Sequence, residues 1–307
     1  MRRYLAMLLP LVGLLATGCA SSYAYGKADP VSGAVVAVGA ENEYADVIQQ
    51  IGGKYVQVNA ILSNPNTDPH TFEASASVAR LLDSAQLVVQ NGVGYDTFMN
   101  TIENAVPSSS RQVLVVQKLL GLPDSTPNPH LWYKPGTMTA VANAVAADLA
   151  ALRPSHAAFF KANAAAFTKS LNTWTSAIAA FKAKYPGTPV AVTEPVADYM
   201  LQAAGADIKT PWAFQADIMN GTDPSAQDVA VERSLFTQHK VKVFLYNQQV
   251  TDSLTESFIA LAKANGIPVV GVYETMPVPG YHYQSWMLAE VQDLGKAVAN
   301  KTSSEHL

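Results

Sequence analysis

Residues 160–185 read FKANAAAFTKSLNTWTSAIAAFKAKY, and their large apolar side chains recur at alternating steps of four and three residues. That spacing places them in one stripe along an α-helix. The stripe consists of Phe160, Ala164, Phe167, Leu171, Trp174, Ile178, Phe181 and Tyr185. Pro154 stands near the start, where a missing N–H is harmless, and Pro186-Gly187 ends the pattern. We predict one helix over residues 153–186, a rod of ~45 Å; a coiled coil is the alternative reading of the same stripe.

Short apolar runs alternate with helical patterns on both sides of this helix. The predicted strands are Val35–Val38, Val56–Leu62, Leu87–Val89, Val113–Val116, Pro189–Thr193, Val241–Tyr246 and Ile267–Val272. The predicted helices are Tyr44–Ile51, Ala74–Asp83, Asp198–Ala204, Gln227–His239 and Asp252–Asn265. Such alternation favours parallel sheets covered by helices on both faces. We therefore predict an α/β fold with two lobes, residues 34–152 and 187–307, joined by the long helix.

The first 19 residues have the pattern of a secretion signal. Arg2 and Arg3 precede an apolar stretch, Leu5 to Leu15, that is too short to span a bilayer. The following Ala16-Thr17-Gly18-Cys19 resembles a lipoprotein cleavage site, although Ala16 replaces the usual leucine. We expect a lipidated Cys19, a flexible linker over residues 20–33 and an extracytoplasmic protein anchored to the cell membrane. A chance cysteine in an ordinary signal peptide is the alternative.

The composition excludes several classes of site and partner. Cys19 is the only cysteine, so an internal disulfide, a Cys-x-x-Cys redox pair and a thiolate metal site are all excluded. Cu(I) loses its natural ligands for the same reason. The net charge is −4 and the basic residues are scattered, so nucleic acid is not an expected partner.

Two of the six histidines occur in similar loops, 60 residues apart. The first loop contains Asp68-Pro69-His70 and the second Asn128-Pro129-His130. Proline fixes its own φ and biases the preceding residue away from helix, so each imidazole is presented from a stiff turn. Both loops come after predicted strands of the first lobe.

Carboxylates occupy the matching positions in the second lobe. Glu194 follows the strand that ends at Thr193, and Glu274 follows the strand that ends near Tyr273. Ligand sites in open α/β sheets lie beyond the carboxyl ends of the strands. Two imidazoles and two carboxylates would therefore meet in a cleft between the lobes, a ligand set that suits Zn²⁺ or Mn²⁺.

The sequence resembles the metal-binding lipoproteins that deliver zinc or manganese to bacterial ABC importers. The resemblance covers nearly the whole chain and rests on DPHTFE (68–73), NPHLWY (128–133), VTEPVADYM (192–200), DPSAQDV (223–229) and PVVGVYETMP (268–277), besides Cys19 and the long helix.

The resemblance implies a C-shaped, two-lobed protein that carries one metal ion in its cleft and hands it to a membrane permease. The ligands it implies are His70, His130, Glu194 and Glu274, with Asp252 as a weaker substitute for the last. The same resemblance implies a monomer. Many zinc-specific members carry a long loop rich in histidine and acids, whereas Gln117–Asn128 here is short and has no histidine. The choice between zinc and manganese therefore stays open.

The remaining candidate residues are assigned supporting roles. His156, His239 and His306 are expected to be structural, whereas His282, in a loop rich in Pro, Gly and Tyr, is a possible further ligand or gate. Glu73 is expected to orient His70. Trp132 and Tyr133 are expected to pack around the site and exclude water, with a place in the ordinary core as the alternative.

We interpret the chain as a binding protein and not an enzyme, because four protein ligands leave no open position for a reactive water. Binding is expected to weaken below about pH 6, where imidazoles take up protons. A metal-dependent hydrolase with Glu73 or Asp217 as base is one alternative, but the chain has no His-Glu-x-x-His, Gly-x-Ser-x-Gly or phosphate-loop motif. An adhesion or scaffold lipoprotein and a binding protein for a siderophore or vitamin are the others.

Overall fold

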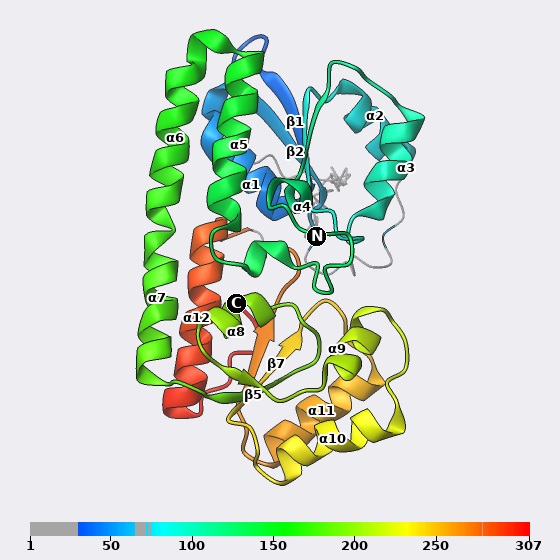
Figure 1. Ribbon diagram of the computed structural model, residues 1–307, viewed down its shortest axis with the longest axis vertical. Coiled ribbons are helices and arrows are strands. Elements are labelled where there is room, and N and C mark those ends of the chain that lie inside the picture. The colour runs from blue at the N-terminus through cyan, green and yellow to red at the C-terminus, as the bar shows by residue number, and fades with distance from the viewer. Residues whose placement is uncertain (1–29, 65–71, 73–74, 278) are drawn as a thin grey trace, which may run out of the picture.

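The computed structural model describes residues 30–64, 72, 75–277 and 279–307. They form two lobes, each built on a parallel sheet flanked by helices, with helices running along one side of both lobes (Figure 1). The predicted signal peptide with Cys19, most of the predicted linker, His70 and Glu73 lie outside the described residues. The predicted two-lobed α/β fold is confirmed.

The first lobe has the strand order β2-β1-β3-β4, with every pair parallel. Its strands are β1 (Val35–Glu41), β2 (Val56–Leu62), β3 (Leu87–Gln90) and β4 (Gln112–Val115). Its helices are α1 (Asn42–Gly52), α2 (Ala76–Ser84), α3 (Thr97–Ala105), α4 (Val116–Leu119) and α5 (Thr137–Leu152), with 3₁₀ turns η1 (Gly53–Tyr55) and η3 (Leu131–Tyr133). β3 is buried along its whole length, as expected for a strand covered on both faces.

The second lobe repeats this arrangement with the order β6-β5-β7-β8. Its strands are β5 (Pro189–Val192), β6 (Asp207–Ile208), β7 (Val243–Asn247) and β8 (Val269–Val272). Its helices are α8 (Asp198–Ala203), α9 (Trp212–Met219), α10 (Ala226–Thr237) and α11 (Ser253–Ala264). Every strand that the sequence predicted is present, whereas the short β6 was missed because two residues carry no periodic signal.

The tail of the chain lies along the outer edge of β8. Gly271 N donates to Ser304 O and Ser304 N donates to Val269 O, each at 2.9 Å, in a parallel bridge. The Ser303 hydroxyl accepts from Val269 N at 3.0 Å, and Leu307 N donates to the Tyr273 hydroxyl at 3.1 Å. A side chain at position 271 would meet the carbonyl of Glu305, so glycine is required there. The tail thus closes the sheet at its β8 side.

The connecting segment differs in detail from the single predicted helix. It is a 3₁₀ turn, η4 (Pro154–His156), followed by α6 (Ala157–Ser170) and α7 (Asn172–Lys184). The two helices meet at Leu171 and follow one line in Figure 1. The hydroxyls of Ser170 and Thr175 bond to backbone carbonyls at this point, which explains the local irregularity. The predicted stripe is buried from Phe160 to Phe181, as its spacing indicated. The domain limits at residues 152 and 186 remain predictions.

A second long helix, α12 (Tyr283–Asn300), was not predicted. It lies beside α7 (Figure 1), and its first residue is tied to the first lobe because Tyr283 N donates to Asp46 Oδ2 at 2.9 Å. The sequence also gave no prediction for α3, α5 and α9. The lobes are therefore braced by two long helical elements where one was expected.

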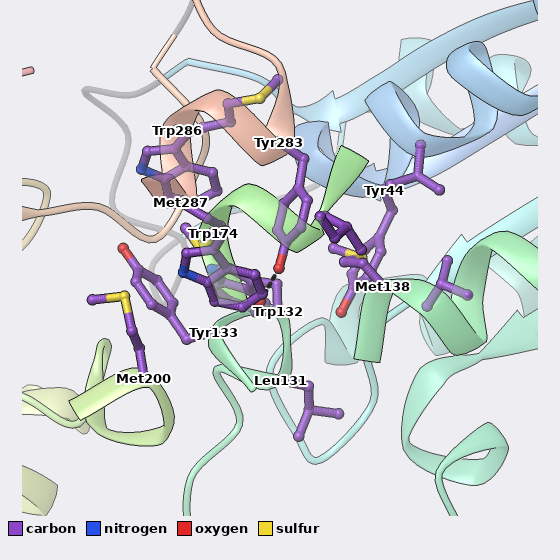
Figure 2. Close-up of a cluster of buried hydrophobic side chains, with 14 of the residues drawn as sticks. Tyr44, Leu131, Trp132, Tyr133, Met138, Trp174, Met200, Tyr283, Trp286 and Met287 are labelled. Carbon is purple, nitrogen blue, oxygen red and sulfur yellow. Dashed lines mark hydrogen bonds between the residues drawn. The ribbon is translucent and has the colours of Figure 1, made fainter. Parts of the chain in front are cut away.

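One hydrophobic core extends across the junction of the lobes. Figure 2 shows its centre, with aromatic and methionine side chains from α1, η3, α5, α7, α8 and α12 packed together. The labelled residues are Tyr44, Leu131, Trp132, Tyr133, Met138, Trp174, Met200, Tyr283, Trp286 and Met287. The Tyr283 hydroxyl donates to the carbonyl of Trp132 at 2.5 Å. Trp132 and Tyr133 are fully buried in this core, and their packing anchors the turn that follows His130.

Candidate metal centre

His130 lies in the loop between α4 and η3 and is fully buried. The side-chain oxygen of Asn128 accepts from His130 N at 3.0 Å and lies 2.8 Å from His130 Nδ1. An amide oxygen only accepts, so Nδ1 carries a proton and Nε2 carries the lone pair in the neutral ring. Asn128 Nδ2 donates to Pro195 O at 2.7 Å, which links this loop to the second lobe. The local contacts therefore select the tautomer in which Nε2 can bind a metal.

The carboxylates of the second lobe lie just past the ends of two strands. Glu194 follows β5 and Glu274 follows β8, and both are buried. Asn247 ends β7, which lies between these strands, and its Nδ2 donates to Glu194 Oε1 at 3.1 Å and to Glu274 Oε1 at 2.5 Å. The sheet thus brings both predicted carboxylates to one edge.

Glu274 also faces the first lobe. Its Oε2 accepts from the Tyr95 hydroxyl at 2.9 Å and lies 3.5 Å from His130 Nε2. Gln249 Oε1 accepts from Glu274 N at 2.6 Å and from Thr275 N at 2.7 Å, which fixes the backbone. The structure therefore places His130 against Glu274, which Asn247 joins to Glu194, in one buried cluster that spans both lobes.

Tyr95 is presented by a loop with unusual backbone geometry. Gly92, Val93 and Gly94 all have positive φ, of 82°, 55° and 77°. This conformation is strained for a β-branched residue such as Val93, and strain of this kind clusters at functional sites. Asp96 holds the loop by accepting from Asn91 N at 2.6 Å and from Gly92 N at 2.9 Å.

Further buried acids surround the first-lobe side of the centre. Burial raises the pKa of Glu41 and of Glu43 well above the usual value, and nearby Asp96 adds to both shifts. Burial also raises the pKa of Asp96 to about 6, against the lowering effect of its backbone hydrogen bonds. Glu274 contributes to the raised pKa of Glu43, so these acids lie within electrostatic range of the centre. Burial thus opposes the ionisation of both Glu41 and Glu43.

A cavity of ≈ 420 Å³ opens between the lobes next to Tyr95. Its first-lobe wall includes Val93, Tyr95 and Pro129, and its second-lobe wall is one face of α9 with Trp212 and Met219. Tyr95 lines this cavity and also donates to Glu274, so its side chain lies between the cavity and the buried cluster.

Within the described ranges, no three His, Cys, Asp or Glu side chains converge closely enough to hold a metal ion. His70, the fourth predicted ligand, lies outside those ranges. Asp252, the substitute ligand, is the N-cap of α11, and its Oδ1 accepts from Thr255 N at 2.7 Å. Asp217, the base nominated for a hydrolase, accepts from the hydroxyl of Thr222 at 3.4 Å.

The other histidines lie in varied surroundings. His156 stacks on Tyr55 with ring centroids 3.8 Å apart. His282 Nδ1 lies 2.7 Å from Asp46 Oδ1, and 71% of the His282 side chain is exposed. His239 follows α10 with a φ of 50°, and His306 lies in the exposed tail.

Three functional candidates escaped the sequence analysis: Tyr95, Asn247 and Gln249. Asn247 directly follows the predicted strand Val241–Tyr246, so the rule that located Glu194 and Glu274 also applied to it, but an amide is not a typical metal ligand. Asn91-Gly92 is a turn signal that marked the loop of Tyr95. Gln249 has no sequence signal, because its role depends on the backbone that it contacts.

None of the described helices combines the length and the apolar character needed to cross a bilayer.

Comparison with known proteins agrees with this architecture. The manganese-binding lipoprotein MntA of Bacillus subtilis is 23% identical over 259 residues, which cover 81% of this chain and 82% of that protein. The manganese ABC transporter substrate-binding lipoprotein PsaA of Streptococcus anginosus is 26% identical over 181 residues, 55% of this chain and 56% of its own length. The solved structure of the periplasmic zinc-binding protein TroA from Treponema pallidum has the same fold, with a TM-score of 0.73 and 19% identity over 87% of this chain and 99% of that one.

A sequence profile described as "Zinc-uptake complex component A periplasmic" matches residues 38–297, which include both lobes and the connecting helices. The chain therefore belongs to the family of the periplasmic zinc-uptake complex component A.

Proposed function

We propose that this protein binds one Zn²⁺ or Mn²⁺ ion between its lobes, with His70, His130, Glu194 and Glu274 as ligands. The observation that carries the proposal is the buried group in which His130 Nε2 lies 3.5 Å from Glu274 Oε2 while Asn247 joins Glu274 to Glu194. Burial of a neutral imidazole and two carboxylates at facing edges of two sheets suits a transition-metal ion. His70 completes the set through its loop, which resembles that of His130 in sequence.

The proposed activity is capture and delivery, without catalysis. Relatives named as ABC transporter substrate-binding lipoproteins support delivery of the ion to a membrane permease. Four protein ligands would close a tetrahedral sphere and leave no position for a reactive water. A siderophore or vitamin is not favoured, because the buried group consists of residue types that bind metal directly. The cavity beside Tyr95 is the proposed access route for the ion.

We further propose that Cys19 is lipidated and anchors the protein outside the cytoplasm as a monomer. The lipoproteins among the relatives and the cleavage pattern before Cys19 support this. Mass spectrometry of the membrane-bound protein would detect the lipid on the N-terminal cysteine. Recovery of the mature protein in the soluble fraction, with an unmodified cysteine, would contradict it.

The deciding experiment uses protein that starts after Cys19 and has been stripped with a chelator. It is titrated separately with Zn²⁺ and Mn²⁺ while heat release and thermal stability are recorded. We expect saturation at one ion per chain and a rise in melting temperature, because the ion binds the folded state alone. Absence of saturable binding by both ions would overturn the proposal.

A further inference from the structure

A single amide connects the two carboxylates of the second lobe. Asn247 is 1% exposed, and its Nδ2 donates one hydrogen bond to each carboxylate, at 3.1 Å to Glu194 Oε1 and at 2.5 Å to Glu274 Oε1. An amide nitrogen has two hydrogens, so both are used. The neutral donor bridges two groups that would otherwise repel one another in a buried site.

The orientation of this amide is fixed by its own contacts. Asn247 Oδ1 accepts from Gln249 N at 2.9 Å, and Asn247 N donates to the Thr193 hydroxyl at 3.0 Å. Because the oxygen faces a donor, the NH₂ group must face the carboxylates. Asn247 ends β7, the inner strand that lies between β5 and β8, so it is next to both strands that carry the carboxylates.

The amide also decides which carboxylate oxygen is presented to the first lobe. It takes Oε1 of Glu274, and the opposite oxygen, Oε2, is the one near Tyr95 and His130. The bond from Asn247 to Oε1, at 2.5 Å, is shorter than the bond from Tyr95 to Oε2, at 2.9 Å, so Oε1 is the more strongly engaged oxygen and the carboxylate favours an incoming ion through Oε2. Two imidazoles and two single carboxylate oxygens make four ligands, the number that Zn²⁺ prefers. Mn²⁺ favours more oxygen ligands, which bidentate carboxylates would supply.

We propose that Asn247 is a specificity-determining residue that holds Glu194 and Glu274 as single-oxygen ligands and thereby favours Zn²⁺ over Mn²⁺. The inference rests on the proposed function, since it takes both carboxylates to be ligands. Asn247 acts through the carboxylates and is a positioning residue that does not touch the ion itself.

The variant Asn247→Leu tests this, because leucine has a similar size and no donor. We expect its affinity for Zn²⁺ to fall about tenfold or more, the usual effect of losing a partner of a metal ligand. Its affinity for Mn²⁺ should fall less, so that the ratio of the two dissociation constants moves toward Mn²⁺. Loading with Co²⁺ gives an independent readout, because intense visible absorption of a tetrahedral Co²⁺ site should weaken in the variant as the coordination number rises.

Asn163→Leu is the matched control, since Asn163 also donates from a partly buried amide, to Ile51 O at 3.0 Å, but lies on α6. Equal losses for both ions in Asn247→Leu, with an unchanged Co²⁺ spectrum, would overturn the inference alone. Wild-type affinity for both ions in Glu194→Gln and Glu274→Gln would overturn the ligand assignment and this inference with it. The inference is supported if Asn247→Leu shifts the ratio of the Zn²⁺ and Mn²⁺ dissociation constants and weakens the Co²⁺ absorption, while both Glu→Gln variants lose affinity.

Discussion

The two halves of the candidate metal centre reach rigidity by different means. In the second lobe, Glu194 and Glu274 lie two residues past β5 and β8, and Asn247 ends the strand between them. In the first lobe, His130 sits in a loop and depends on side-chain contacts, above all those of Asn128. The strand ends bring the second half-site together, and Asn247 and Gln249 only refine it, whereas the half-site in the loop is held by side-chain contacts alone. Substitutions should therefore affect the halves differently.

The largest effect should come from removing the first-lobe imidazole. His130→Ala deletes the ring beside Glu274, so we expect metal affinity to fall by at least about a hundredfold, since a proposed ligand and not merely its support is lost. Calorimetric titration with Zn²⁺ and Mn²⁺ measures this. His156→Ala, which removes a ring stacked on Tyr55, should leave the affinity intact. Equal losses in both variants, or a circular-dichroism spectrum that shows unfolding, would contradict this difference.

The link between the halves is tested next by Asn42→Ala. Asn42 Nδ2 donates to Met276 O at 2.7 Å, and Met276 N donates to Asn42 Oδ1 at 2.8 Å, so one buried side chain of α1 is paired with the backbone that follows Glu274. Its loss leaves two buried backbone groups without partners, and we expect a cost of about 2–4 kcal/mol in the free energy of unfolding. Urea unfolding measures it. Asn220→Ala, at an exposed site, should change stability by no more than about 0.5 kcal/mol.

The pH dependence of stability tests the contact between Glu290 of α12 and Tyr133 of the first lobe. Burial raises the pKa of Glu290 from 4.5 to about 8, although Trp286 and Tyr133 donate to its Oε1. Between these values the folded state keeps a proton that the unfolded state releases, so the contribution of Glu290 to stability is lost as the pH rises from about 4.5 to 8. Glu290→Gln has no such titration and can still accept both bonds. We expect it to be more stable than the wild type by about 1–3 kcal/mol at pH 8, and less so at pH 5.

Urea unfolding of the metal-free protein at both pH values checks this. Glu256→Gln, an exposed change on α11, serves as the control and should keep the wild-type pH profile. A Glu290→Gln variant that loses stability with rising pH as steeply as the wild type would exclude Glu290 as the source.

The smallest expected effect concerns the contact that joins the halves directly. Tyr95→Phe removes the hydroxyl that donates to Glu274 Oε2 and keeps the ring against His130 and Trp132. One hydrogen bond contributes about 0.5–1.5 kcal/mol, so metal affinity should fall by about two- to tenfold. Competition with a chelating dye resolves such a change. Tyr55→Phe, at a tyrosine stacked on His156, is the control, and an unchanged affinity in Tyr95→Phe would show that the contact does not support the site.

The difference between the halves also explains what could be predicted from the sequence. Strands are recognisable in the sequence as apolar runs. Once β5 and β8 were predicted, the position of Glu194 and Glu274 just past their ends could be predicted too. The stripe from Phe160 to Phe181 likewise predicted a buried helical connection. The supporting hydrogen bonds could not be predicted from the sequence. Asn128, Gln249 and Tyr95 contact groups that are distant in sequence or backbone groups that no sequence pattern marks. α12 was missed for a related reason: its register depends on contacts such as that of Tyr283 with Asp46, which only the folded chain creates.

The tail along β8 affects whether copies of this protein associate with one another. β8 is the outermost strand of its sheet, and an uncovered outer strand is a template on which another chain can add its own backbone. Ser303 and Ser304 already bond to backbone groups of Val269 and Gly271 in this strand, and Leu307 N is held by the Tyr273 hydroxyl just beyond it. Removing residues 303–307 should therefore favour self-association and aggregation, detectable by light scattering at high concentration, before it affects metal binding. These few residues would thus protect the protein against pairing with its own copies.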